Sequence, residues 1–89
     1  MNTDFKTSYG QDVKKTSKAL KARIKEAVKT VEEAKTMKDI PQLKKAKGCK
    51  KGISYRIRIG DYRIGVEIVG DMVTFTTFGH RNCFYNKFP

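Results

Sequence analysis

The sequence contains few of the residues on which metal sites, disulfides and membrane segments depend. Its 89 residues include two cysteines, one histidine and no tryptophan. Cys49 and Cys83 form no C-x-x-C pair and lack the companion ligands that a metal site requires. No apolar run approaches the roughly 18 residues that span a bilayer, and the N-terminal residues lack the apolar block of a signal peptide. We therefore expect a cytoplasmic protein with free thiols, no membrane segment, no metal and no cofactor.

Acidic residues are also scarce, and their scarcity is local. The chain has 20 basic and 9 acidic residues, a formal charge of +11. The segment 43–60 has no acidic residue and contains Lys44, Lys45, Lys47, Lys50, Lys51, Arg56 and Arg58. Such a block indicates a polyanionic partner such as nucleic acid, although its lysines alone could serve only to keep a surface soluble. Membrane binding is disfavoured because the block lacks an apolar helical face.

The segment 53–68, ISYRIRIGDYRIGVEI, is typical of a β-hairpin with one apolar and one arginine face. Gly60-Asp61 suits a two-residue turn, because glycine tolerates a positive φ. The predicted apolar pairs are Ile59 with Tyr62, Ile57 with Ile64, Tyr55 with Val66, and Ile53 with Ile68. The other face carries Arg58 beside Arg63, and Arg56 beside Gly65. Opposed like charges destabilise a sheet, so we expect this face to hold an anion, with phosphate as the candidate.

The first half of the chain predicts helices. Apolar residues recur at helical spacing from Tyr9 to Ala34. One helix of that span would be roughly 39 Å long, against a radius of gyration of about 12 Å for a globule of this size. A break at Lys15–Ser17 therefore predicts two helices packed as a hairpin. We also expect an edge strand at Thr3–Lys6 and a helix that begins at Asp39, with Pro41 in its first turn.

A second Gly-Asp turn, Gly70-Asp71, predicts a third strand over Met72–Phe78. The predicted pairs are Ile68 with Val73, Val66 with Phe75, and Ile64 with Thr77. This register puts Phe78 beside Arg63 on the arginine face, and His80 on the same face if the strand continues. The expected fold is a single α+β domain over residues 1–89, with two N-terminal helices packed on one face of a small antiparallel β-sheet.

Cleavage of RNA without a metal needs a base for the 2′-hydroxyl, cations near the phosphate and an acid for the leaving 5′-oxygen. Arginines stay charged and stabilise the negative charge that grows in the transition state, while histidine and tyrosine can transfer protons. The candidates for these roles are Arg56, Arg58, Arg63, His80 and Tyr85. DNA lacks the 2′-hydroxyl, so RNA is the expected substrate if the protein is an enzyme. A lone histidine is more often structural. Glu67 is a further candidate base, although pairing with Ser54 or a lysine is the role we favour for it.

These residues resemble the RelE/ParE superfamily of bacterial toxins, and in particular its short RelE-like branch. The similar segments are DIPQLKKAKGCKKGISYRIRIGDYRIGVEI at 39–68 and GHRNCFYNKF at 79–88. The resemblance implies the toxin of a type II toxin–antitoxin pair, an endoribonuclease that cuts messenger RNA in the A site of the small ribosomal subunit. The implied partners are a cognate antitoxin, messenger RNA and the ribosome.

The resemblance also implies roles for single residues. Arg56, Arg58 and Arg63 match basic residues that bind the phosphate, and Arg81 matches the basic residue of the closing strand. Tyr85 matches a general base proposed in some members, and His80 a position that holds histidine or another basic residue. The expected RNA-binding residues are Lys44, Lys45, Lys47, Lys50, Lys51 and Phe78. Two alternatives remain at this point: a ParE-like inhibitor of DNA gyrase, and a basic RNA- or partner-binding module without enzymatic activity.

Overall fold

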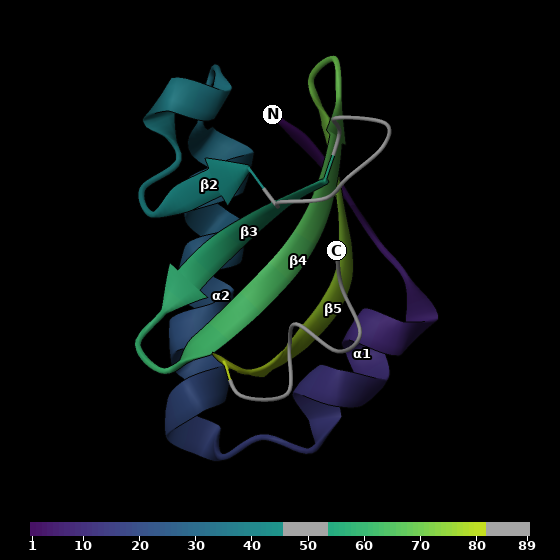
Figure 1. Ribbon diagram of the computed structural model, residues 1–89, viewed down its shortest axis with the longest axis vertical. Coiled ribbons are helices and arrows are strands. Elements are labelled where there is room, and N and C mark those ends of the chain that lie inside the picture. The colour runs from purple at the N-terminus through teal and green to yellow at the C-terminus, as the bar shows by residue number, and fades with distance from the viewer. Residues whose placement is uncertain (46–53, 82–89) are drawn as a thin grey trace.

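The protein forms a five-stranded sheet with two helices on one face. The computed structural model describes residues 1–45 and 54–81. The strands in spatial order are β1 (Asn2–Phe5), β5 (Met72–His80), β4 (Tyr62–Val69), β3 (Ser54–Ile59) and β2 (Leu43–Lys45) (Figure 1). Neighbouring strands run antiparallel except β1, which pairs in parallel with β5. The α+β class is confirmed, but the sheet is mixed rather than wholly antiparallel.

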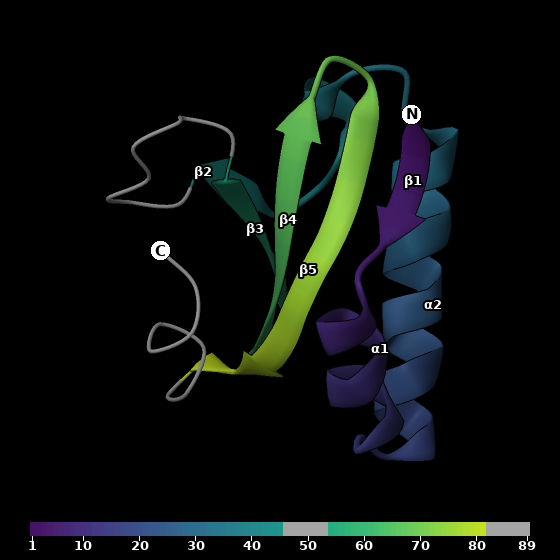
Figure 2. The same ribbon diagram turned by 90° about the vertical axis from the view of Figure 1, so that its right-hand side faces the viewer.

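The helical segment breaks where the sequence predicts. Helix α1 spans Thr7–Lys14 and α2 spans Lys18–Glu33. The Ser17 hydroxyl oxygen accepts a hydrogen bond from the backbone N–H of Leu20 at 3.3 Å, so it caps the first turn of α2. The break lets α1 and α2 run in opposite directions on the same face of the sheet (Figure 2). The remaining face of the sheet carries no helix of the described chain.

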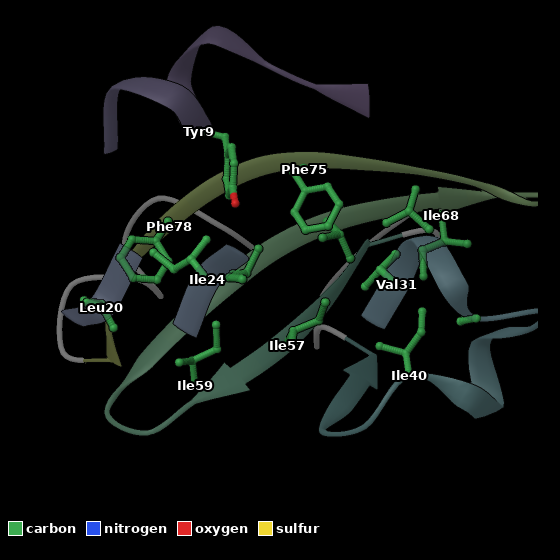
Figure 3. Close-up of a cluster of buried hydrophobic side chains, with 14 residues drawn as sticks. Tyr9, Leu20, Ile24, Val31, Ile40, Ile57, Ile59, Ile68, Phe75 and Phe78 are labelled. Carbon is green, nitrogen blue, oxygen red and sulfur yellow. The ribbon is translucent and has the colours of Figure 1, made fainter. Parts of the chain in front are cut away.

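One hydrophobic core lies between the sheet and the helices (Figure 3). It joins the apolar stripe of α2 to the inward face of β3, β4 and β5. Each such side chain that leaves water contributes about 1.5–3 kcal/mol to folding. The buried apolar residues are Tyr9, Leu20, Ile24, Val31, Ala34, Ile40, Ile57, Ile59, Ile64, Val66, Ile68, Val73, Phe75 and Phe78.

The prediction of a helix beginning at Asp39 is wrong. Asp39 ends a 3₁₀ turn, η1 (Met37–Asp39), instead of opening a helix. Its carboxylate accepts hydrogen bonds from the backbone N–H groups of Lys35 and Thr36, each at 3.2 Å. Asp39 thus binds the residues that precede the turn and caps its N-terminal end. The chain then continues into β2, which pairs with β3 and was not predicted.

The predicted register of the first hairpin is confirmed. Gly60 has φ 56°, which a glycine adopts without steric cost. Ile59 faces Tyr62, Arg58 faces Arg63, and the pairs of Ile57 with Ile64, Tyr55 with Val66 and Arg56 with Gly65 follow as predicted. The predicted pair of Ile53 with Ile68 lies outside the described residues.

The second hairpin departs from the prediction at a β-bulge. Ile68 pairs with Val73 and Val66 with Phe75, as predicted, but the register shifts between Gly65 and Val66. Thr76 is the extra residue of β5, so Ile64 faces Phe78 and not Thr77. Because strand side chains alternate, one extra residue moves everything after it to the other face.

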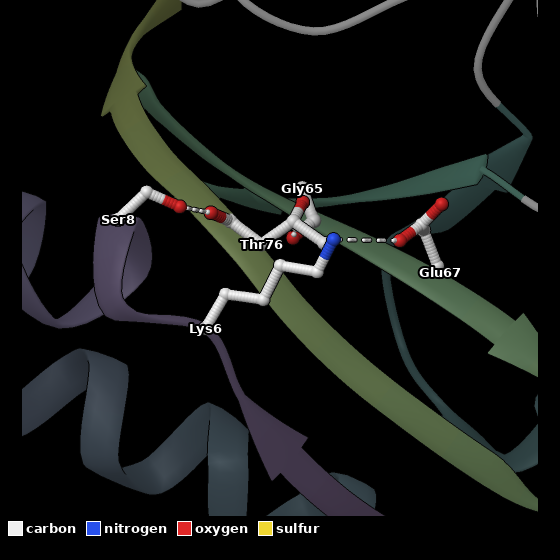
Figure 4. A network of polar contacts seen from close by, with 5 residues as sticks. All are labelled: Lys6, Ser8, Gly65, Glu67 and Thr76. Atoms are coloured by element: carbon white, nitrogen blue, oxygen red, sulfur yellow. Dashed lines mark hydrogen bonds and ion pairs between the residues drawn. The ribbon is translucent and has the colours of Figure 1, made fainter.

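Side chains of α1 and the bulge itself hold the extra residue in place. The Ser8 hydroxyl donates to the backbone oxygen of Thr76 at 2.6 Å, and the Thr76 hydroxyl donates to the backbone oxygen of Gly65 at 3.0 Å (Figure 4). The nearby ion pair of Lys6 with Glu67 spans 3.6 Å between partly exposed groups and adds little to stability.

Asp12 of α1 makes the second attachment. One of its carboxylate oxygens accepts from the Thr77 hydroxyl at 3.0 Å and from the backbone N–H of Phe78 at 3.2 Å. Both donors belong to buried residues. Helix α1 therefore fixes the register of the last part of β5.

We expect Asp12→Ala to lower the free energy of unfolding by about 1–3 kcal/mol, because it leaves two buried donors without an acceptor. Urea denaturation measures the change. Gln11→Ala, at an exposed neighbouring position of the same helix, is the control and should have little effect. Equal stability of the two variants would contradict the role given to Asp12.

Tyr9→Phe is expected to make the protein less sensitive to alkaline pH. Burial raises the pKa of Tyr9 from 10.0 to about 12, and its ring lies 5.3 Å from that of Phe75. The folded state thus disfavours the phenolate, so this contribution to stability is full below pH 10 and is lost as the pH rises towards 12. Urea denaturation of both proteins between about pH 10 and 12 should show that the free energy of unfolding falls more steeply with pH for the native chain than for the variant. Parallel curves would contradict the prediction.

Candidate functional site

Four cationic side chains gather on the face of the sheet opposite the helices. The register puts Lys44 of β2 opposite Arg56 of β3, and Arg58 of β3 opposite Arg63 of β4. The strand neighbours of the three arginines include Ile57, Ile59 and Ile64, which point into the core. Because strand side chains alternate, the four cationic side chains point to the face without helices. We call Lys44, Arg56, Arg58 and Arg63 the basic face.

The basic face encloses a small cavity, which we call the arginine pocket. Its volume is about 80 Å³, and Gln42 lines it together with Lys44, Arg56, Arg58 and Arg63. No acidic side chain of the described residues is among its lining. The volume is far below the roughly 300 Å³ at which small-molecule pockets begin, so it suits one small anionic group. Guanidinium groups bind phosphate oxygens in pairs, which makes phosphate the matching anion.

Arg63 is held in place by the turn of its own hairpin. Its Nη1 donates to the backbone oxygens of Gly60 and Tyr62, each at 2.9 Å. A guanidinium has five N–H donors, and within residues 1–45 and 54–81 the others of Arg63 have no hydrogen-bond partner. The side chain is therefore both fixed and able to bind an anion.

The closing strand brings Arg81 to the same turn. The backbone N–H of Arg81 donates to the backbone oxygen of Asp61 at 2.8 Å, and the residue is exposed. Arg81 thus lies at the end of the sheet where Arg58 and Arg63 flank the turn. The structure brings together the three arginines that the sequence proposed for the phosphate and keeps the fourth nearby.

The predicted placement of Phe78 and His80 on the arginine face is wrong. Phe78 is 3% exposed and belongs to the buried cluster that contains Leu20 and Ile24 (Figure 3). Its ring stacks on Tyr62 at 5.4 Å, and the His80 ring meets Tyr62 edge-on at 5.3 Å. The bulge causes both errors, because it reverses the faces after Thr76. Phe78 is a core residue and does not project from the basic face.

The predicted lysines divide into three groups. Lys44 lines the arginine pocket, whereas the exposed Lys45, one residue further along β2, alternates to the opposite face. Lys47, Lys50, Lys51 and the predicted base Tyr85 lie outside the described residues.

Gln42 is a site residue that the sequence did not reveal. Its φ is 61°, and it is the one residue other than glycine with a positive φ in the described chain. It lines the arginine pocket and an adjacent groove that also includes Arg23 of α2. Glutamine has no preference for the left-handed region, so the pattern Pro41-Gln42 gave no sign of this conformation. Arg23 was missed because it looks like one more cation on the polar side of a helix.

Residues 1–45 and 54–81 contain neither a metal-binding cluster nor a membrane-spanning helix. No group of three or more histidine, cysteine, aspartate or glutamate side chains is arranged to hold a metal ion. In the same part of the chain, no helix has the length and apolar character needed to cross a membrane.

The chain is similar to toxins of known sequence and structure. It is 33% identical over 90 residues to Toxin RelE3 of Methanocaldococcus jannaschii, a match that covers both proteins completely. The RelB–RelE antitoxin–toxin complex from Methanococcus jannaschii contains a chain that matches with a TM-score of 0.79 at 31% identity, over 97% of this chain and 99% of that one. YafQ from E. coli strain BL21(DE3) shares the fold, with a TM-score of 0.73 at 9% identity over 94% and 97% of the two chains. No family model matches the sequence.

We expect Arg58→Ala to weaken the binding of single-stranded RNA and to flatten its dependence on salt. Each phosphate contact to a single strand contributes about 0.7 to the slope of log K against log salt, so loss of one contact should reduce the slope by that amount. Fluorescence titrations at several salt concentrations measure it. Lys25→Ala removes the same charge from an exposed position on α2 and serves as the control. An equal loss of slope in both variants would show that the basic face has no special role.

Proposed function

The chain belongs to the RelE family of toxins, and on this premise we propose that it is the toxin of a type II toxin–antitoxin pair and cleaves messenger RNA in the ribosomal A site. The first part follows from the match to Toxin RelE3 over the full length of both chains. The cleavage activity is supported by one observation above all, the arginine pocket on the open face of the sheet.

The arginine pocket has the chemistry that the cleavage of a phosphodiester requires. Attack of a 2′-oxygen on phosphorus adds negative charge to the phosphate oxygens as the bond to the 5′-oxygen breaks. Arg56, Arg58 and Arg63 would stabilise that charge, and a side chain fixed before the reaction does so without reorganisation. Arg63, which the turn carbonyls hold, meets this condition.

The proposal needs a base for the 2′-hydroxyl and an acid for the leaving 5′-oxygen. Tyr85 and His80 are the two candidates. The ring of His80 lies against Tyr62 at the end of the sheet beside Arg81, not over the arginine pocket. His80 therefore lies on the face of Tyr62 and not on that of the arginine pocket, so a proton transfer by His80 would need RNA that passes around the end of the sheet.

The proposed partner is a cognate antitoxin. The matching chain from Methanococcus jannaschii comes from a complex of a RelB antitoxin with a RelE toxin. With a formal charge of +11, this chain would bind an acidic companion with a rate that falls as salt increases.

We expect Arg63→Ala and Arg81→Ala to abolish the growth arrest that follows induction of the native protein, while both variants remain folded. Each removes a cation from the end of the sheet where the phosphate would bind, and loss of such a group typically costs 10²- to 10³-fold in rate. The measurement is growth after induction, together with the mapping of transcript 5′ ends. Lys25→Ala is the matched control and should arrest growth as the native chain does.

Each of the other outcomes identifies a different function. Persistent arrest by both arginine variants at normal expression would contradict the catalytic assignment. Broken DNA with intact transcripts would favour the gyrase inhibitor. The double variant His80→Gln, Tyr85→Phe tests the third alternative. If it still arrests growth and its RNA binding falls steeply with salt, the protein is a binding module without cleavage.

A further inference from the structure

A groove lies next to the arginine pocket, between the end of β3 and α2. Its volume is about 400 Å³, and it is lined by Arg23, Glu26, Gln42, Arg58, Ile59 and Gly60. Gln42 and Arg58 line both the groove and the pocket, so the two spaces are adjacent. A volume of this size falls in the range of small-ligand sites, whereas the pocket holds only a single small group.

We propose that this groove is a subsite for the nucleotide next to the phosphate held in the arginine pocket. In it, Arg23 binds the following phosphate, and the side chains of Gln42 and Glu26 make hydrogen bonds to the base. This subsite rests on the proposed function, because it takes RNA as the ligand of the pocket.

Arg23 is placed for a phosphate by the turn of the β3–β4 hairpin. A Cβ atom at Gly60 would lie 3.2 Å from Nη1 and 3.5 Å from Nη2 of Arg23, so the guanidinium packs directly on the backbone of the turn. Glycine at position 60 therefore serves two purposes: it provides the positive φ and leaves space for this cation. Arg23 of α2 and Arg58 of β3 thus line the same groove. Two cations placed in this way could contact successive phosphates of one nucleic-acid strand.

The polar residues between the two arginines suit a base rather than a third phosphate. Glu26 would repel a phosphate, but its carboxylate can accept hydrogen bonds from the amino group of a base. The amide of Gln42 both donates and accepts. Ile59 adds an apolar wall to the same groove.

The backbone of Gln42 supports a functional role for its side chain. A φ of 61° is unfavourable for glutamine, and glycine or asparagine would adopt it at lower cost. The conformation is held by a hydrogen bond from the Arg58 N–H to the Gln42 backbone oxygen at 3.3 Å. That bond joins the two residues that the pocket and the groove share.

Gln42→Gly tests the side chain without destabilising the fold. Glycine removes the side-chain amide, and it adopts the positive φ of this position without strain. We expect a melting temperature equal to or above that of the native protein, with affinity for an RNA trinucleotide reduced about tenfold. Arg23→Ala should reduce the same affinity to a similar extent. Lys25→Ala, which removes an equal charge from α2 outside the groove, should leave it unchanged.

Inorganic phosphate is the second probe, and its expected site is the arginine pocket, which four cationic side chains line. We expect Arg23→Ala, which lies outside the arginine pocket, to bind phosphate as the native chain does, whereas Arg58→Ala weakens the binding of both phosphate and the trinucleotide. Native affinity of both groove variants for the trinucleotide would overturn the subsite. Because binding is measured without cleavage, that result is separate from a failure of the proposed function, which would appear as intact transcripts with the native protein.

Discussion

Burial of the apolar face of the β3–β4 hairpin is the constraint on which the rest of the structure depends. Ile57, Ile59 and Ile64 are packed into the core that α2 covers. Because strand side chains alternate, the register that buries them also turns Arg58 and Arg63 to the open face, directly opposite one another. A slip of one residue would bury the guanidiniums and expose the isoleucines. Unpaired buried charge costs several kcal/mol, far more than repulsion between two solvated cations. The core thus holds like charges together.

The bulge in β5 determines what lies beside those charges. With Thr76 as an extra residue, Phe78 enters the core and stacks on Tyr62, and the strand ends with the Arg81 N–H bonded to the turn at Asp61. Without it, an aromatic ring would cover the arginines. Asp12 fixes this choice through hydrogen bonds to Thr77 and Phe78. Helix α1 therefore contributes to the site from the opposite face of the sheet, through the register of one strand.

The sequence predicted those parts of the site that depend on local turns and on alternation. The hairpin register and the break before α2 follow from Gly60 and Ser17, whose preferences act over a few residues. The register beyond Gly65 was wrong, although a glycine inside a strand is a known sign of a bulge. The deciding partner was Asp12, more than sixty residues away in sequence. Strand β2 and Gln42 were missed for a similar reason, since pairing with β3 outweighed the helix signals of Asp39 and Pro41.

Two features that lower the stability of this fold, repulsion between like charges and a strained backbone angle, occur at the same place. The opposed arginines and the left-handed Gln42 line the same pocket. Elsewhere in the described chain, buried polar side-chain atoms all have hydrogen-bond partners, and the glycines of both hairpin turns adopt the positive φ that suits them. Strain and repulsion that gather at one surface, in a fold that otherwise satisfies its groups, are typical of a site kept for binding. An anion bound there would offset the repulsion and stabilise the folded chain by mass action.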